Sequence, residues 1–240
     1  MSDARKHRGP HPEDETLFSA DQVPALRSAA SHLSWLLSRG YALPSSLKLV
    51  GDRFLLKERQ RTAVKRATCS DQQKIERART QLRSDEIAGR SILVDGFNLT
   101  TTIEASLSGG VLLRCQDGCI RDMASMHGSY RKVTETEPAL LLIGRQFAER
   151  SLTSVKWLLD QPVSNSGRLR KLIENIALEH EWPWTVELVP DPDVILRETS
   201  DLIVTADSGI LDECVQWWNA AESMLDQTQP PWLIDLTHSS

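Results

Sequence analysis

Five aspartates in the second half of the sequence each come at or just after the end of a short apolar run typical of a buried strand: Asp95, Asp160, Asp191, Asp207 and Asp235. In an open parallel sheet, ligands bind beyond the carboxyl ends of the strands, so such aspartates would gather at one edge. Two carboxylates about 4 Å apart repel by roughly 4 kcal/mol at an effective dielectric constant near 20, so a cluster needs protons or a cation. Oxygen ligands suit Mg²⁺ or Mn²⁺, which hold phosphates and activate water. Taken singly, each aspartate is more typical of a helix N-cap.

The first of these aspartates lies in the motif ILVDGFNLTTTIE, at residues 92–104. Gly96 allows a tight turn after Asp95, and Asn98 can bind a ligand or hold the aspartate in place. Glu104 comes nine residues after Asp95 and would reach the same site if the intervening loop folds back.

The second informative motif is LIVTADSGILD, at residues 202–212. It predicts a strand followed by the start of a helix that Ser208 could cap. Asp207 would then point into the cleft, and Asp212, one helical turn later, would either join it or face solvent.

A third polar segment, VSNSGRLR at residues 163–170, is expected to open a helix close to Asp160. Free backbone N–H groups at a helix start bind anions, and arginine adds positive charge there. The same pattern also fits an ordinary serine-capped helix. Two arginines further upstream are possible bidentate phosphate ligands, and His127 is a possible general base or a structural residue. The candidate phosphate-binding residues are Ser164, Asn165, Ser166, Arg168, Arg121 and Arg131.

Strand and helix patterns alternate in the second part of the chain, which predicts a parallel sheet with right-handed crossovers and helices on both faces. We expect strands at 91–94, 154–159, 185–189, 202–205 and 232–234. We expect helices at 136–150, 166–180 and 208–225, with a hairpin or loop region between the first strand and residue 113. The first part of the chain shows helical spacing at 21–40, 44–50, 57–67 and 71–88.

The net charge of −5 conceals an asymmetry between the two parts of the chain. Residues 1–90 carry 17 Lys and Arg against 11 Asp and Glu, whereas residues 91–240 carry 11 against 22. This change of sign predicts a flexible segment at 1–20, a basic helical domain at 21–90 and an acidic α/β domain at 91–240. The basic residues are either a solvated helical face or a surface that binds phosphate.

The motifs after the first and fourth strands resemble those of PIN-like nucleases, whose NYN branch has Asp-Gly-x-Asn after a strand. A late strand followed by Thr-x-Asp is similar to another acidic motif of that superfamily. The resemblance implies a Rossmann-like three-layer α/β/α sandwich after the small helical domain, and an acidic metal site that cuts RNA, less often DNA. It also implies that the catalytic and metal-binding residues are Asp95, Asp160 and Asp207, with Glu104 or Asp212 completing the metal site.

Several longer stretches, among them LSWLLSRGY, SLKLVGDRF and LSGGVLLRCQDGCIRDMASMHGSYR, are similar to the prokaryotic family known as domain of unknown function 434. This resemblance spans nearly the whole chain and brings no activity with it.

We therefore expect a Mg²⁺- or Mn²⁺-dependent nuclease with a nucleic-acid partner. Two alternatives stay open: a non-catalytic nucleic-acid-binding or adaptor protein, and a Toprim-like phosphotransfer enzyme. The sequence lacks a secretion signal and any run of about 20 apolar residues. It thus predicts a cytoplasmic protein without a membrane partner, whose four cysteines are reduced. It is compatible with a homo-oligomer.

Overall fold

Six parallel strands form the main sheet, in the order β1-β8-β7-β2-β5-β6. The computed structural model describes residues 7–124, 130–230 and 232–237. The sheet pairs are all parallel, which confirms the prediction of a mixed α/β fold with a parallel sheet. The strands are β1 (Gln81–Leu82), β2 (Ser91–Asp95), β5 (Ser154–Asp160), β6 (Trp184–Val189), β7 (Leu202–Val204) and β8 (Trp217–Trp218).

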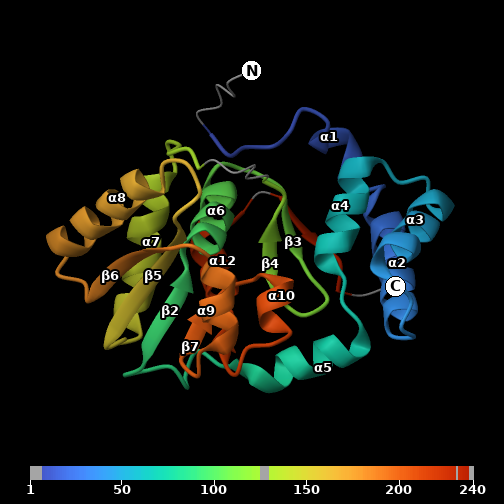
Figure 1. The fold of residues 1–240 in the computed structure, drawn as a ribbon. Coiled ribbons are helices and arrows are strands. Elements are labelled where there is room, and N and C mark those ends of the chain that lie inside the picture. Colours follow the sequence, from blue (N-terminus) through green and yellow to red (C-terminus); the bar gives the residue numbers. More distant parts are fainter. Residues whose placement is uncertain (1–6, 125–129, 231, 238–240) are drawn as a thin grey trace.

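Helices cover both faces of this sheet (Figure 1). Successive side chains of a strand point to opposite faces, and β2 shows this clearly. Ile92 and Val94 belong to a core with α6 (Gly96–Leu107), α7 (Thr136–Glu149) and α8 (Ser166–Glu179). Leu93 belongs to a second core with α9 (Pro192–Glu198) and α10 (Ser208–Leu211). Two short helices, α11 (Ala220–Ser223) and α12 (Leu225–Thr228), contact α6.

A separate three-stranded sheet connects the main sheet to the N-terminal helices. Its order is β4 (Ile120–Asp122), β3 (Leu112–Arg114) and β9 (Leu233–Asp235), with β9 parallel to β3. In Figure 1 the red β9 runs between the green hairpin and the blue helices. The N-terminal helices are α1 (Asp14–Leu17), α2 (Val23–Leu37), α3 (Leu43–Arg53), α4 (Glu58–Ala67) and α5 (Asp71–Thr80).

The N-terminal helices and the small sheet share one hydrophobic core. Leu26 of α2 and Val64 of α4 are buried in the same cluster as Leu113 of β3 and Ile234 of β9. The helical segment is therefore packed against residues from the middle and the end of the described chain. The segment before α2 is fixed as well, because Asp14 is fully buried and pairs with an arginine of α4.

Three expectations about the elements are wrong. Residues 96–107 form a helix rather than a loop, although three threonines in a row disfavour helix; burial of nearly the whole segment overrides this preference. The expected helix 208–225 is broken, since Trp217 and Trp218 form β8 and are fully buried. The expected helix 71–88 ends at Thr80, because the chain continues into β1.

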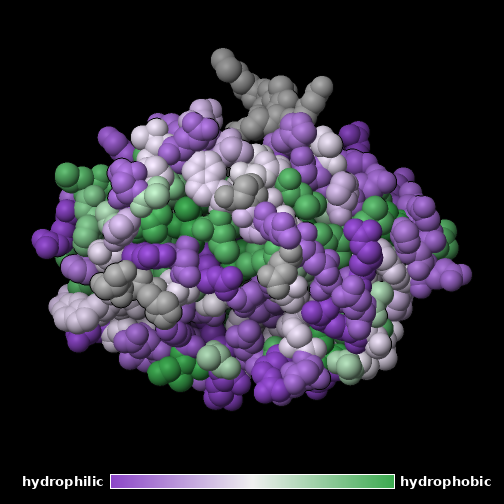
Figure 2. Space-filling view, turned by 180° about the vertical axis from the view of Figure 1, so that it is seen from behind, coloured by the Kyte–Doolittle hydropathy of each residue, from purple (hydrophilic) through white to green (hydrophobic). Residues whose placement is uncertain are grey.

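The surface carries hydrophobic side chains in several patches that polar groups interrupt, as on the face shown in Figure 2. The larger exposed ones include Trp35 of α2, partly covered by the Arg39 guanidinium 3.7 Å from the ring centre. Within the described ranges, the helices are all too short or too polar to cross a bilayer.

Candidate functional site at the carboxyl edge of the main sheet

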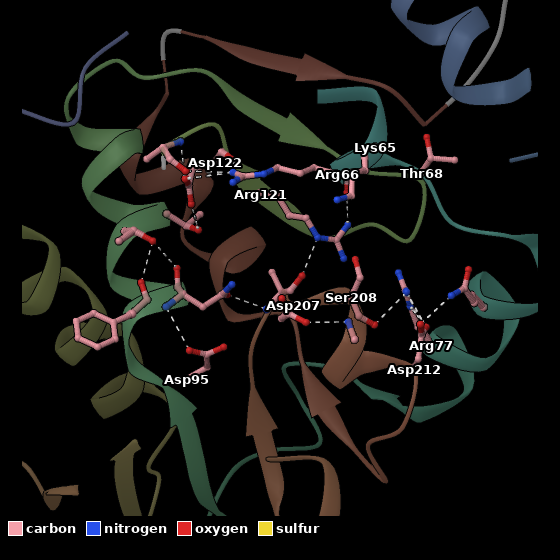
Figure 3. A pocket seen from close by; sticks show the side chains of 18 of the residues that line it. Lys65, Arg66, Thr68, Arg77, Asp95, Arg121, Asp122, Asp207, Ser208 and Asp212 are labelled. Carbon is pink, nitrogen blue, oxygen red and sulfur yellow. Dashed lines mark hydrogen bonds and ion pairs between the residues drawn. The ribbon is translucent and has the colours of Figure 1, made fainter. Parts of the chain in front are cut away.

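A pocket of about 650 Å³ lies between the carboxyl edge of the main sheet and the N-terminal helices. Figure 3 shows how its side chains converge from elements far apart in the sequence. One wall carries the three aspartates expected to be catalytic, Asp95, Asp160 and Asp207. The opposite wall is formed by residues of α2 to α5, including Lys65 and Arg66 of α4. The pocket therefore joins an acidic wall to a basic one.

Asp95 and Asp207 follow neighbouring strands. β2 pairs with β7, with Val94 opposite Val204, and the next strands along the chain lie on the other side of β2. The order of strands thus reverses between β2 and β7, which is where open α/β sheets bind their ligands. Asp160 ends β5, the neighbour of β2 on its other side. Four of the five expected aspartates lie at this edge, whereas Asp235 ends β9 of the small sheet.

The hydroxyl of Thr205 joins the two central aspartates. It donates to Oδ2 of Asp95 at 2.8 Å and accepts the backbone N–H of Asp207 at 3.1 Å. Both aspartates also cap helices: Asp95 accepts from the N–H of Asn98 at the start of α6, and Asp207 from that of Gly209 at the start of α10. The N-cap role and the position in the pocket therefore coexist in the same residues.

The Asp95 carboxyl has no arginine or lysine partner in the described part of the chain, and only 8 % of the residue is exposed. Its pKa is raised to about 7; burial is the largest cause, and the nearby charges of Asp207 and Asp193 act in the same direction. The hydrogen bonds from Thr205 and from the Asn98 backbone oppose this shift. Near neutral pH, Asp95 is thus poised between its protonated and charged forms.

Other carboxylates add negative charge around this pair. Burial raises the pKa of Asp160, with a contribution from Asp191. It also raises the pKa of Asp193, in the first turn of α9, with contributions from Asp207 and Asp191. Even so, the described residues contain no group of three His, Cys, Asp or Glu side chains placed to hold one metal ion together. The structure therefore places the three catalytic candidates in one pocket, but not close enough together for all three to coordinate the same ion.

Ala206, the residue before Asp207, is held through both its backbone N–H and its carbonyl. Asn98 accepts the N–H of Ala206 through Oδ1 at 2.9 Å, and Nε of Arg121 donates to the Ala206 carbonyl at 2.7 Å. Because the Ala206 N–H needs an acceptor, the amide NH₂ of Asn98 is turned away from it. Asn98 and Arg121, both expected to contact substrate, thus fix the backbone that carries Asp207.

A buried ion network immobilises two of the arginines that line the pocket. Asp117 pairs with Arg77 and Arg121, and its side chain is 1 % exposed. Burial alone would raise the pKa of Asp117, but the charges and hydrogen bonds of the two arginines lower it. Asp212 accepts from Arg77 at 2.6 Å and from Gln73 at 2.7 Å. Asp212, expected as a metal ligand, is therefore occupied by an arginine.

The structure does not bring Glu104 to the pocket. It lies nine residues along α6 from the cap, about 13 Å at 1.5 Å per residue. The Glu104 carboxylate is fully buried and accepts hydrogen bonds from Arg8, Tyr130 and Thr136. Burial raises its pKa. The loop that was expected to fold back is a helix, so this residue stabilises the interior instead.

The polar loop before α8 also lies outside the pocket lining. The carbonyl of Ser164 accepts the N–H of Tyr130, and the Asn165 amide donates to the Tyr130 carbonyl at 2.8 Å. Ser166 is buried and Arg168 is exposed. Arg131 lies beside Tyr130, and its carbonyl accepts from Arg8. Three of these five residues, Ser164, Asn165 and Arg131, thus link the loop, the segment around Tyr130 and the N-terminal segment. His127 lies outside the described residues.

Several residues of the pocket had no clear signal in the sequence. Asp122 of β4 lines it and accepts from Thr102 at 2.9 Å. Asp193 is not part of the lining, although its charge acts on Asp95; it follows a proline at a helix start and resembles an ordinary first-turn acid. The basic run on α4 is visible in the sequence, but nothing there indicates that Lys65 and Arg66 face the acidic sheet edge. These contacts depend on how α4 packs, which the local pattern does not encode.

Comparison with known proteins gives a family without an assigned activity. Residues 25–79 match the family described as "Protein of unknown function (DUF434)", so the resemblance to that family is confirmed for this segment and not for nearly the whole chain. The chain is also 26 % identical over 187 residues to "Uncharacterized protein MJ0935" of Methanocaldococcus jannaschii, covering 78 % of this chain and 89 % of the relative. No solved structure matches the chain. Residues 84–223, more than half of the chain, match the family "Domain of unknown function (DUF5616)", and the protein belongs to that family.

Proposed function

We propose that the protein is a divalent-metal-dependent phosphodiesterase that cleaves nucleic acid, RNA in preference to DNA. One observation carries this proposal: Asp95 at the end of β2 and Asp207 just after β7 lie where the strand order reverses, in a pocket whose opposite wall is basic. Acidic groups suit a metal ion and basic groups suit phosphate. The Asp-Gly-x-Asn and Thr-x-Asp motifs at these two positions support a PIN-like assignment of the main sheet and, with it, the preference for RNA.

The donor set fits Mg²⁺ or Mn²⁺. Mg²⁺ keeps several water molecules and is commonly bound by one or two carboxylates together with substrate phosphates. Asp95 and Asp207 would supply these two carboxylates, and the Asp95 carboxyl lacks a protein cation in the described residues. When bound, the ion would polarise the phosphodiester and lower the pKa of a water molecule.

The remaining contacts would keep the two carboxylates in place. Thr205 holds Asp95 by a hydrogen bond. The hydrogen bonds of Asn98 and Arg121 to Ala206 hold the backbone before Asp207. Asp160, half-buried and beside β2, would accept a proton from an attacking water or bind it. The Asn98 amide NH₂, which has no acceptor among the described residues, would donate to the substrate.

Mn²⁺ binding to the protein, measured by isothermal titration calorimetry after removal of metal, tests the metal site. We expect Asp95→Asn and Asp207→Asn to abolish binding, and the same two variants to abolish Mn²⁺-dependent cleavage of a fluorogenic RNA. Asp235→Asn is the matched control, because Asp235 also ends a strand but lies in the small sheet. If both pocket variants bind Mn²⁺ like the unmodified protein, the assignment is wrong.

A non-catalytic nucleic-acid-binding role through α4 has less support. Arg59 pairs with Asp14, and Arg61 pairs with Asp52 and also donates to backbone carbonyls. Both arginines therefore already have partners within the helical segment. RNA binding without Mn²⁺ binding or cleavage would favour this role over the nuclease.

A further inference from the structure

Among the described residues, one cation on the basic wall of the pocket has no protein partner. Four lysines and arginines of the described chain line the pocket. Arg77 and Arg121 are held by Asp117, and Arg66 donates to the carbonyls of Asp122 and Ala124. Lys65 is exposed and makes no hydrogen bond or ion pair with the described residues. Among the described residues, Lys65 is therefore the pocket cation without a protein partner.

Two leucines lie on the same wall. Leu37, at the end of α2, and Leu43, at the start of α3, line the pocket together with Lys65. Both are only partly buried against the helical core, so each also presents apolar surface to the pocket. The wall thus combines an apolar patch with a free ammonium group, opposite the acidic sheet edge.

A pocket of about 650 Å³ is within the range that encloses a single small ligand. A nucleotide in a single strand can place its base on an apolar surface and its phosphate beside a cation. A base inside a duplex is stacked and paired, and would first have to be flipped out.

We propose that this wall is a nucleoside subsite: a base lies on Leu37 and Leu43, and Lys65 binds the adjoining phosphate, so that the pocket accepts single-stranded nucleic acid and not duplex. The proposal rests on the proposed function for the class of ligand. It does not require that the strand be cleaved.

Fluorescence anisotropy with a fluorescein-labelled oligouridylate of about twelve nucleotides, in EDTA, tests the subsite in the full chain. We expect Lys65→Met to weaken binding roughly tenfold and to reduce the slope of log affinity against log salt by about 0.7, the value for one phosphate contact on a single strand. Lys171→Met is the control. Lys171 lies on α8, is exposed and has no ion pair in the described residues. If the two variants behave alike, Lys65 is not a phosphate ligand.

Leu43→Ala and a duplex probe examine the base contact. We expect Leu43→Ala to weaken binding roughly threefold to tenfold with an unchanged salt slope, because no charge is removed. The thermal unfolding midpoint is recorded for each variant, and Leu37→Ala, on the same wall, is used if Leu43→Ala unfolds. The oligouridylate annealed to oligoadenylate should compete at least about tenfold more weakly. Equal competition by the duplex would overturn the single-strand preference.

The two proposals fail separately. If Mn²⁺ binding and cleavage are absent but binding of the oligonucleotide in EDTA depends on Lys65, the nuclease is refuted and the subsite stands. If cleavage depends on Asp95 and Asp207 while Lys65→Met and Leu43→Ala bind and cleave normally, the subsite is refuted and the nuclease stands.

Discussion

Asp95 and Asp117 are both buried aspartates beside the same pocket, but their surroundings differ. Asp117 lies between Arg77 and Arg121, and the two arginine charges outweigh burial and lower its pKa. Asp95 meets a threonine hydroxyl and a backbone N–H but no cation in the described chain, and burial raises its pKa to about 7. One carboxylate is neutralised within the protein, and the other is not.

The difference distinguishes structural from functional charge. A buried ion pair with good hydrogen bonds is costly to break from one side, since the remaining charge is left without a partner. A buried carboxylate without a counter-charge lowers stability whenever it is ionised. Such a residue is a candidate for binding or catalysis, because a ligand can supply the missing charge. The same substitution at the two positions should therefore have opposite effects.

The largest effect is expected for Asp117→Asn. The variant keeps the size of the side chain but leaves Arg77 and Arg121 buried with one net charge uncompensated, which should lower the free energy of unfolding by about 3–5 kcal/mol. Urea denaturation at pH 7 measures it. Glu174→Gln, which breaks the exposed pair with Arg170 on α8, should change it by less than about 0.5 kcal/mol. A small effect at Asp117 would contradict the structural role of the network.

Asp95→Asn should have the opposite sign. The folded pKa of about 7 lies above the ordinary value of 3.8, so the stability linked to the bound proton is fully present below about pH 4 and is lost as the pH rises through 7. The variant should be more stable than the unmodified protein at pH 8 in EDTA, by up to about 4 kcal/mol, and equally stable at pH 4. If the free energies of unfolding of the two proteins change with pH in parallel over this range, the pKa of Asp95 is not raised in the folded state.

A smaller effect is expected for Thr205→Val. The variant removes the hydroxyl that donates to Asp95 and accepts from the Asp207 backbone, which should cost about 1–3 kcal/mol. The pKa of Asp95 should rise further, because the lost hydrogen bond favours its charged form. Carboxyl NMR titration of the two proteins measures that shift. A downward shift would mean that Thr205 does not stabilise the carboxylate.

The smallest effect is expected for Asp160→Asn. Burial raises the pKa of this half-exposed carboxyl in the same direction as that of Asp95, but solvent screens much of its charge. We expect the variant to gain less than about 1 kcal/mol at pH 8. A gain in the free energy of unfolding as large as that of Asp95→Asn would mean that Asp160, like Asp95, is a buried charge without a counter-charge.

The position of the aspartates at the carboxyl edge of the sheet could be predicted from the sequence, because the patterns that indicate it are local. Each strand is a short apolar run, and each candidate aspartate comes at or just after its end. Parallel alternation then predicts that Asp95, Asp160 and Asp207 share an edge, as they do. The direct pairing of β2 with β7 did not follow from the sequence, because the chain forms β5 and β6 on one side of β2 before β7 pairs on the other.

Features that depend on contacts between residues far apart in the sequence could not be predicted in this way. Residues 96–107 are helical because they are buried between α7 and the sheet, despite their threonines, and that helix carries Glu104 to Arg8. The pairing of Asp117 with Arg77 spans 40 residues. Nor does the amphipathic pattern of α4 indicate that Lys65 faces the acids. Such contacts form only after the elements have assembled.

The parallel pairing of β9 with β3 has a consequence for the timing of folding. Nε of Arg27 in α2 donates to the carbonyl of Asp235, a residue 208 positions later. At about 5–20 residues per second, α2 leaves the ribosome roughly 10–40 s before β9 does. During that interval the apolar faces of α2 and α4 lack the contacts with β9 that complete their core. The helical segment is synthesised first but reaches its native packing late, when residues 233–235 have joined the small sheet.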